Sequence, residues 1–474
     1  MTTRWCCPLR TPNRPRPSAT RRSSWPTRRC DGSPGLDAQP HSLIACEHCA
    51  SVYRWHTLEH GETAACERCG STLWRYSGLG PSSWLALTLA ALFIFALANA
   101  FPVASLSVQG MVSNATLLDA VHITWRQGHY AVALMTGTVG FVIPMLQILV
   151  LLWVLGPLSR GVLPWGFEPI VRLLGMLHPW SMVPVFLLGV LVSVIKLAGM
   201  ASVELRAGLL GFAVLTVLLT MLSRLQPATL WRMAERARVV PVTLPPMTAD
   251  TVLAGCHVCG QVQALPSRED PETHHHCERC HAVLHYRKPN SVSRTWALLL
   301  AAALLYIPAN VLPVMQIVSI TGGSGHTILG GVIELWQMGS WDIALIVFIA
   351  SIVVPLTKLL SLAFLTLSLQ WRSTTNLRQR TRLYQMVEFI GQWSMLDVFV
   401  VIILAALADF QGLMEISAGA GAASFGLVVV LTMLAAMTFD LRQCWDVEQQ
   451  PGGELTPAQQ VMPSSAGQPS LNHH

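Results

Sequence analysis

Eight long apolar segments alternate with short polar stretches along most of the chain. Each is long enough, at about 17 residues or more, for an α-helix to cross a lipid bilayer. The segments fall into two groups of four and cover residues 83–102, 130–156, 173–200 and 208–224, and then 296–313, 341–369, 383–410 and 420–439. The pattern therefore predicts a mainly α-helical, polytopic membrane protein with eight transmembrane helices arranged as four plus four.

A four-cysteine motif precedes each group of apolar segments. The two motifs have the spacings Cys46-x2-Cys49-x16-Cys66-x2-Cys69 and Cys256-x2-Cys259-x17-Cys277-x2-Cys280. Two CxxC pairs at this distance are typical of structural zinc sites, in which four thiolates surround the ion as a tetrahedron. We therefore expect two zinc ions, one in each of two small zinc-ribbon-like domains. A redox role stays open, because CxxC pairs can exchange disulfides and a four-thiolate site can hold iron.

The other cysteines and the histidines do not form a further motif of this kind. Cys6, Cys7, Cys30 and Cys444 lie outside the two sets, so the cysteines do not suggest a disulfide scaffold, and the zinc interpretation implies a reducing compartment. A run of three histidines, residues 274–276, precedes Cys277 and could supply a substitute ligand. A solvent-exposed run is the expected interpretation.

The two halves of the chain are copies of one another. The tetrapeptide Cys-Glu-Arg-Cys occurs twice, 211 residues apart, and near the third apolar segment of each half the offset becomes 213. The matched pairs include Asn99 with Asn310, Pro102 with Pro313, Trp125 with Trp336, Pro144 with Pro355, and Trp180-Ser181-Met182 with Trp393-Ser394-Met395. An even number of spans in each half makes the copies point the same way, which predicts a pseudo-twofold axis along the membrane normal. Gene duplication is the simplest origin.

Seven regions follow from these patterns. They are a disordered Arg- and Pro-rich tail at 1–43, a first zinc ribbon at 44–78, a four-helix transmembrane module at 79–226, a linker at 227–254, a second zinc ribbon at 255–288, a second four-helix module at 289–441 and a disordered tail at 442–474. The first tail contains no apolar run of the kind found in a signal peptide. Both tails have too few apolar residues to offset the entropy lost on ordering.

Composition and charge agree with a membrane location. Only 12% of residues are charged, whereas 52% are hydrophobic. The net charge of +6 could suggest nucleic acid, but the arginines are concentrated in the first tail and in short loops, where they act as topology signals. Loops that contain Arg160, Arg172 and residues 372–382 fall on the same side as both cysteine motifs. Both termini and both zinc ribbons are therefore predicted to be cytoplasmic, and no nucleic acid partner is expected.

Two charged residues lie inside the apolar segments of the second half. Lys358 is about 20 Å of helix away from Trp371, and Asp397 lies at a comparable depth, so the two could form a pair. A charge at such depth costs several kcal/mol unless it has a partner or water, which makes these residues candidates for a transport site. Thr357, Ser394 and Pro355 complete the candidate site. A structural ion pair is the alternative.

The first half lacks these charges, because Gln147 and Pro184 take the positions of Lys358 and Asp397. We therefore expect the second block to hold the working site. Pro144 and Pro355 should kink or break their helices. Lys196 and Asp409 lie near the other membrane face, where long or acidic side chains can reach water.

The loops 103–129 and 314–340 are unusually apolar. Residues 104–108 and 316–320 alternate like short strands, and each loop continues into a partly amphipathic run that ends near Trp125 or Trp336. Such runs could lie at the outer interface and form a docking surface, with simple membrane anchoring as the alternative. No phosphate loop, GxSxG elbow or HExxH motif occurs, so neither nucleotide binding nor enzymatic activity is expected.

The order of these features resembles the paraquat-inducible protein A family. The resemblance covers about residues 44–440 and includes Asn-x-x-Pro at the end of the first span and Trp-Ser-Met at the start of the third. It implies an inner-membrane protein of Gram-negative bacteria that acts with an MCE-domain partner, which builds a periplasmic lipid tunnel. The chain would then load phospholipid into that tunnel or extract it. The resemblance also implies that the eight cysteines bind zinc and that Lys358 and Asp397 form the intramembrane polar site.

Three functions are therefore considered. The first is lipid transport, with Lys358 and Asp397 as a proton-coupled switch. The second is a membrane-bound thiol or electron carrier that uses the CxxC sites. The third is a passive anchor for a periplasmic partner, in which case neutralising the buried charges would be tolerated.

Overall fold

The computed structural model describes residues 3–6, 43–55, 58, 62–75, 78–108, 111–181, 183–198, 202–241, 251–266, 275–319, 322–337, 339, 341–373, 375–391, 396–407 and 414–446. The chain divides into two compact units. The first combines Met1–Ser77, Val242–Tyr286 and Trp445–His474, and the second combines Gly78–Pro241 and Arg287–Cys444. The two cysteine motifs thus share one unit, and the two apolar blocks share the other.

The cysteine unit is built from short hairpins. The first motif lies on β2 (Leu43–Ala45), β3 (Val52–Arg54), β4 (Thr63–Cys66) and β5 (Thr72–Arg75), and the second on β9 (Thr251–Gly255), β10 (Val262–Pro266), β11 (His275–His276) and β12 (Val283–Leu284). Each CxxC pair occupies the turn of one hairpin. A further strand, β1 (Thr3–Cys6), pairs in parallel with β4 inside the segment predicted to be disordered. The rest of that segment up to residue 42 lies outside the described residues.

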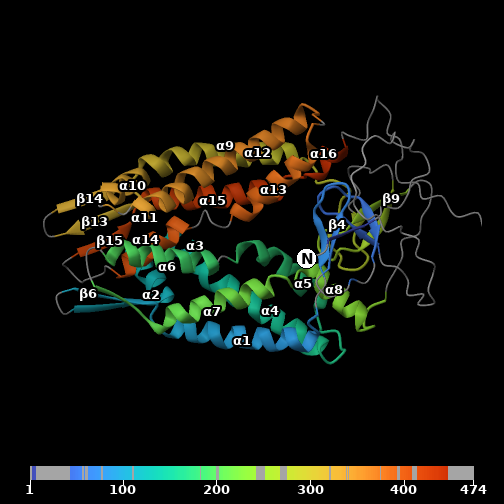
Figure 1. Cartoon of the computed structure of the whole chain (residues 1–474), viewed down its shortest axis with the longest axis horizontal. Helices are drawn as coiled ribbons and strands as arrows, with labels where there is room; N and C mark the ends of the chain where they lie inside the picture. Colours follow the sequence, from blue (N-terminus) through green and yellow to red (C-terminus); the bar gives the residue numbers. More distant parts are fainter. Residues whose placement is uncertain are drawn as a thin grey trace, which may run out of the picture. The chain divides into compact units, whose positions relative to one another are not determined.

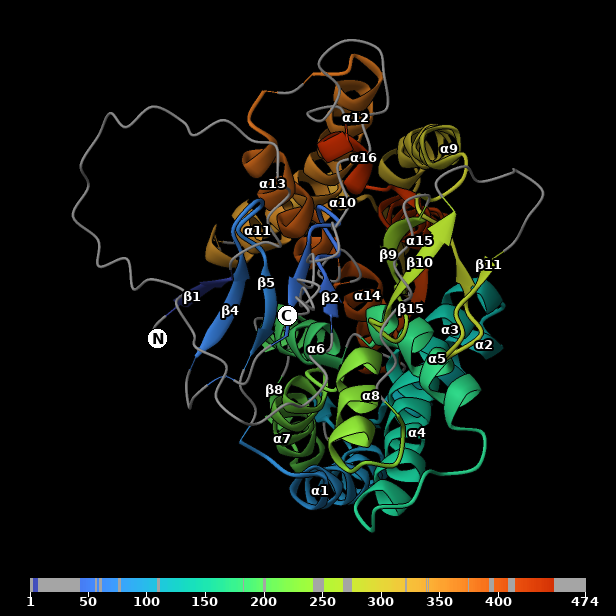
Figure 2. The same ribbon diagram turned by 90° about the vertical axis from the view of Figure 1, so that its right-hand side faces the viewer.

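The two motifs pack against each other within this unit. Strand β2 of the first contacts β9 and β10 of the second (Figure 2). The approach is close, because a Cβ atom built on Gly255 would lie 2.6 Å from the Cβ of Ala45. Only a residue without a side chain fits at position 255.

The described part of the first apolar block forms eight α-helices and one sheet. The helices are α1 (Pro81–Ala100), α2 (Leu117–Arg126), α3 (Tyr130–Gly137), α4 (Ile143–Leu158), α5 (Phe167–Leu177), α6 (Val183–Ala198), α7 (Ala207–Leu222) and α8 (Pro227–Arg236). The sheet has the order β7-β6-β8, with β6 (Ala104–Val108), β7 (Met111–Ala115) and β8 (Ser202–Leu205). All pairs in this sheet are antiparallel.

The second block repeats this arrangement element by element. Its helices are α9 (Ser291–Val311), α10 (Ile328–Gln337), α11 (Trp341–Phe348), α12 (Val354–Gln370), α13 (Leu377–Gly391), α14 (Leu396–Leu407), α15 (Ala420–Thr438) and α16 (Arg442–Asp446). Its sheet has the order β14-β13-β15, with β13 (Met315–Ser319), β14 (Gly322–His326) and β15 (Met414–Ala418). Helix α1 packs against α4 and α7, and α9 packs correspondingly against α12 and α15. Figure 1 shows both sheets at the same end of the helical blocks.

The structure confirms the tandem architecture predicted from the sequence, including the strands in the two apolar loops. Among the described residues, six helices are long and apolar enough to cross a membrane, namely Pro81–Ala100, Tyr130–Leu158, Phe167–Val194, Ser291–Val311, Ala344–Gln370 and Ala420–Asp446. Helices α7 and α8, bent by 61°, could form a seventh span. The predicted segment 383–410 falls on α13 and α14, with residues 392–395 outside the described part of the chain. The eight-span arrangement stays a prediction.

A π-helix precedes each of the two mid-span prolines. The π-helices η1 (Thr138–Val142) and η3 (Ile349–Val353) are 211 residues apart and lie directly before α4 and α12. Proline lacks an N–H group and crowds the carbonyl four residues earlier. The wider π turn accommodates this, since the N–H of Ile143 bonds to the carbonyl of Thr138. The kink or break expected at each proline is therefore a π-helix, and the helix continues on both sides of it.

Candidate metal centres and intramembrane site

All four CxxC turns have the same backbone geometry. In the first, the N–H of Cys46 donates to the carbonyl of Ser51 at 2.9 Å, and the N–H of Ala50 donates back to Cys46. Equivalent pairs of hydrogen bonds form at Cys66, Cys256 and Cys277. The last residue of each turn has a positive φ, and these residues are Ala50, Gly70, Gly260 and His281. The four turns thus present their thiols in the same way, two from each turn.

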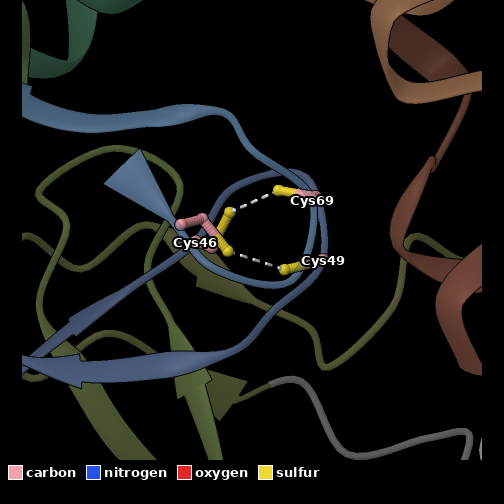
Figure 3. A group of neighbouring side chains, drawn as sticks. Cys46, Cys49 and Cys69 are labelled. Carbon is pink, nitrogen blue, oxygen red and sulfur yellow. Dashed lines mark hydrogen bonds between the residues drawn. The ribbon is translucent and has the colours of Figure 1, made fainter. Parts of the chain in front are cut away.

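The four thiols of each motif converge on one point. All ligand atoms within a set lie within 4.8 Å of one another, and all eight cysteines are buried. The shortest sulfur distances are 3.5 Å for Cys46 to Cys69, 3.5 Å for Cys49 to Cys66, and 3.5 to 3.6 Å in the second set. Figure 3 shows the side chains of Cys46, Cys49 and Cys69 directed toward each other.

These distances fit a metal ion. A tetrahedral site with Zn–S bonds of about 2.3 Å has sulfur atoms roughly 3.8 Å apart. A disulfide would bring two sulfur atoms to about 2.05 Å. All eight thiols are free in the structure. Each cluster could therefore hold one metal ion through four sulfur atoms.

Hydrogen bonds within each cluster lower the pKa of its third cysteine. Hydrogen bonds from the other thiols, that of Cys46 first, lower the pKa of Cys66. The same effect, led by Cys256, lowers the pKa of Cys277. A hydrogen bond donated to a thiolate favours its charged form. Hydrogen bonds from neighbouring thiols also lower the pKa of Cys69 and of Cys256.

Hydroxyl groups lie beside the first cluster, and the spacing of the cysteines does not indicate them. The hydroxyl of Tyr53 lies 3.1 Å from the sulfur of Cys66, and the Ser71 hydroxyl lies 2.8 Å from the sulfur of Cys69. The matching positions in the second cluster carry Gln263 and Ala282. In the sequence, these residues are only a Tyr and a Ser near CxxC turns. Their contact with the sulfur atoms becomes apparent only when the turns are folded together.

The histidine run does not join the second cluster in the described residues, where that group consists of the four cysteines. His276 is exposed on β11, with its Nδ1 atom 3.2 Å from the carbonyl of His281. His274 lies outside the described part of the chain.

Lys358 is a buried cation of the second block. Its side chain on α12 is 3% exposed, and its ammonium nitrogen has no hydrogen-bond partner among the described residues. A Cβ atom on Gly391 of α13 would lie 3.2 Å from this nitrogen. The missing side chain at position 391 therefore makes room for the amine.

The other residues predicted for this site differ in burial, and some of them are not described by the structure. Pro355 is buried at the start of α12, whereas Thr357 is exposed and does not face the interior with Lys358. Asp397 lies in the first turn of α14, but its side chain is not described, and Ser394 lies outside the described residues. The predicted pairing of Lys358 with Asp397 stays a prediction. Lys196 lies in α6 with an undescribed side chain, and Asp409 is also outside the description.

The first block has a buried polar group at the matching position. Gln147 of α4 is 2% exposed, and its side-chain oxygen has no partner in the described part of the chain. Gln147 and Lys358 are 211 residues apart, each on the helix that follows a π-helix. Both halves therefore place a polar side chain in the interior, but only the second places a charge there.

Comparison with known proteins supports the repeat. A model of the family described as paraquat-inducible protein A matches residues 82–235 and 292–449. The chain belongs to the paraquat-inducible protein A family. The two matched stretches are the two apolar blocks, so the family's repeat coincides with the structural one, and the resemblance drawn from the motif order is confirmed.

Relatives match the chain over most of its length. It is 34% identical over 418 residues to the intermembrane transport protein PqiA of Escherichia coli strain K12, covering 87% of this chain and 97% of that protein. It is 31% identical to the lipophilic envelope-spanning tunnel protein A of the same strain, over 85% of this chain and 91% of the relative. A probable intermembrane transport protein of Haemophilus influenzae is 27% identical, over 87% and 98%. No solved structure matches the chain.

Proposed function

We propose that the protein is an integral component of an intermembrane phospholipid transport system in the bacterial inner membrane. It loads lipid into, or extracts lipid from, a tunnel built by a periplasmic MCE-domain partner. The observation that carries this proposal is the family membership, because the relatives spanning most of the chain are named for intermembrane transport and for an envelope-spanning tunnel. These names describe transport rather than a catalysed reaction.

The working site of this transporter is the interior of the second block. Lys358 supports this assignment, since a buried amine in an apolar helix is costly unless it binds or exchanges something. We propose that Lys358 and Asp397 form a proton-coupled switch, with Pro355 and its π-helix as the flexible element. Gln147 at the matching position leaves the first block without an ionisable group there.

The two cysteine clusters each hold a structural zinc ion in this proposal. Four buried thiols at tetrahedral separations leave no open coordination position for a substrate. Both clusters and both termini lie on the cytoplasmic side, in agreement with the basic loops. Labelling of single cysteines in intact spheroplasts tests this orientation, and modification of the cluster side from outside would contradict it.

The decisive experiment is complementation of a transport-deficient strain with Lys358→Ala and Asp397→Asn variants. We expect both to lose outer-membrane barrier function at unchanged protein levels. Thr357→Ala is the matched control, because it changes the exposed neighbour of Lys358 and should keep full function. If the Lys358 and Asp397 variants complement as well as the wild type, the switch is wrong and a passive anchor for the periplasmic partner explains the chain better.

A further inference from the structure

Helix α13 of the second block begins with a dense group of arginines. Arg372 precedes the helix, and Arg378, Arg380 and Arg382 occupy its first two turns. No Asp or Glu occurs between residues 371 and 387. If these arginines only set the orientation of the chain in the membrane, a positive charge near the membrane surface would be sufficient.

Arg380 does more than a topology signal requires, because it is 94% buried (6% exposed). Its guanidinium donates to the carbonyl of Ser373 at 2.7 Å, to the hydroxyl of Ser373 at 2.7 Å and to the hydroxyl of Thr375 at 3.5 Å. These acceptors are neutral, and Arg380 forms no ion pair with any described residue. Arg380 thus holds the turn between α12 and α13 in place while its charge stays unneutralised. A buried charge without a counter-ion is unfavourable, and it adds positive potential at this end of α13.

The exposed side of α13 forms a stripe that is cationic in its first turns and apolar further along the helix. Arg378 and Arg382 are exposed in the first turns, and Met386 and Phe389 follow on the same side with 56% and 68% exposure. Trp371 is 73% exposed just after the end of α12, and an exposed Trp at the end of an apolar helix is typical of the membrane interface. The stripe therefore offers cations at headgroup level and apolar side chains below them.

The first block provides an internal comparison. At the 213-residue offset Met386 and Phe389 correspond to Leu173 and Met176, which are also exposed. In contrast, the three arginines correspond to Trp165, Phe167 and Pro169. Phe167 is buried against Trp231, with ring centroids 4.6 Å apart. The apolar half of the stripe is thus common to both blocks, but the cationic half occurs only in the block that contains Lys358.

We propose that this stripe of α13, residues Arg378, Arg382, Met386 and Phe389, is a binding site for an anionic phospholipid. The arginines bind the headgroup phosphate, the apolar residues contact the acyl chains, and Arg380 is a positioning residue that fixes the adjoining turn and adds positive potential. The choice of a lipid rests on the proposed transport function. The site is the place where an anionic lipid associates with the second block before it reaches the interior.

Native mass spectrometry of the purified full chain tests this site. The protein is titrated with phosphatidylglycerol and phosphatidylethanolamine of matched acyl chains. We expect the wild type to retain phosphatidylglycerol in preference to phosphatidylethanolamine. The affinity for phosphatidylglycerol should fall about fivefold for each arginine replaced in the variant with Arg378→Gln and Arg382→Gln. The matched control is Arg160→Gln with Arg224→Gln, which removes the same charge from exposed positions in loops of the first block and should keep the preference.

Three results would overturn the site. They are an unchanged preference in the α13 variant, an equal loss in the control, and complete displacement of the lipid by glycerol phosphate, which would indicate a site for free phosphate esters. Because this assay measures binding alone, its outcome is separate from complementation by the Lys358 variants. Retained lipid binding with fully functional Lys358 variants would contradict the switch and leave the site intact.

Discussion

Phe186 and Phe399 meet across the junction of the two apolar blocks, with ring centroids 5.5 Å apart and ring planes at 80°. They are also equivalent positions of the repeat, 213 residues apart. Two equivalent residues can touch each other only near the axis that relates their copies. The contact between α6 and α14 is therefore where we expect the pseudo-twofold axis to pass.

The surroundings of this pair break the symmetry. A Cβ atom on Gly189 would lie 3.0 Å from the Cβ of Phe399, whereas the position equivalent to Gly189 is Ile402. The hydroxyl of Ser193 donates to the carbonyl of Val400 at 3.2 Å, and its equivalent is Ala406. The duplicated helices have thus become complementary partners.

Phe399→Ala should destabilise the helical unit by about 3 kcal/mol, because both rings are buried and the removal leaves a cavity. Thermal unfolding in detergent measures this loss. Phe93→Ala is the control, since Phe93 is 65% exposed on α1 and its removal leaves no cavity. Equal losses in the two variants would show that the junction does not depend on the aromatic pair.

Gly255→Ala should separate the two cysteine domains, because the added methyl group overlaps Ala45. We expect faster proteolysis of the cysteine unit, with both metal ions retained, since each cluster takes all its ligands from its own motif. Adding Ala45→Gly to this variant removes the opposing methyl group and should restore protection. If the double variant stays sensitive, the defect arises somewhere other than this contact.

Cys66→Ser and Cys277→Ser should each lower the zinc content from two ions to one per chain. Each change removes a ligand from one cluster and leaves the other complete. Elemental analysis of the purified protein gives the count, and Cys444→Ser is the control, because this buried thiol belongs to neither cluster. Iron, or a reducible disulfide in place of zinc, would favour the thiol or electron carrier.

Tyr53→Phe combined with Ser71→Ala should weaken zinc binding at the first cluster by roughly 10-fold or more. Both hydroxyls lie within hydrogen-bonding distance of the thiol sulfurs, and partners of this kind tune metal affinity. The zinc ion of the first cluster should be released to a chelator faster than in the wild type. The second cluster has Gln263 and Ala282 at these positions, so its release rate should not change.

Asp440→Asn should destabilise the second block by about 2 kcal/mol, the range of a hydrogen bond to a charged group. The carboxylate accepts from the Arg442 guanidinium at 2.9 and 3.0 Å and from the backbone N–H of Lys288 at 2.9 Å. The Lys288 ammonium in turn donates to the carbonyl of Met437 at 2.6 Å. This network ties the end of α15 to the start of α9. Unchanged melting of the variant would mean that packing alone holds these helix ends together.

Much of the molecule follows from local signals in the sequence. The CxxC spacing predicted two four-thiol clusters, because a tight turn fixes the position of two ligands with few residues. The apolar segments and the 211-residue offset predicted a duplicated helical membrane protein. Alternation and recurrence also predicted strands at 104–108 and 316–320, and the structure forms them at Ala104–Val108 and Met315–Ser319. Each of these signals depends on residues close together in the chain or on a copied pattern.

Contacts between distant segments could not be predicted in this way. Nothing in the sequence placed Ala45 against Gly255, Tyr53 against Cys66, or Phe186 against Phe399. The sequence also treated Thr357 and Lys358 alike, whereas the structure buries only the lysine, with its amine at Gly391. Hydrophobicity and spacing determine which segments become helices, hairpins and metal clusters. Which faces of those elements meet depends on the packing of side chains from the whole chain, and only the tertiary structure decides it.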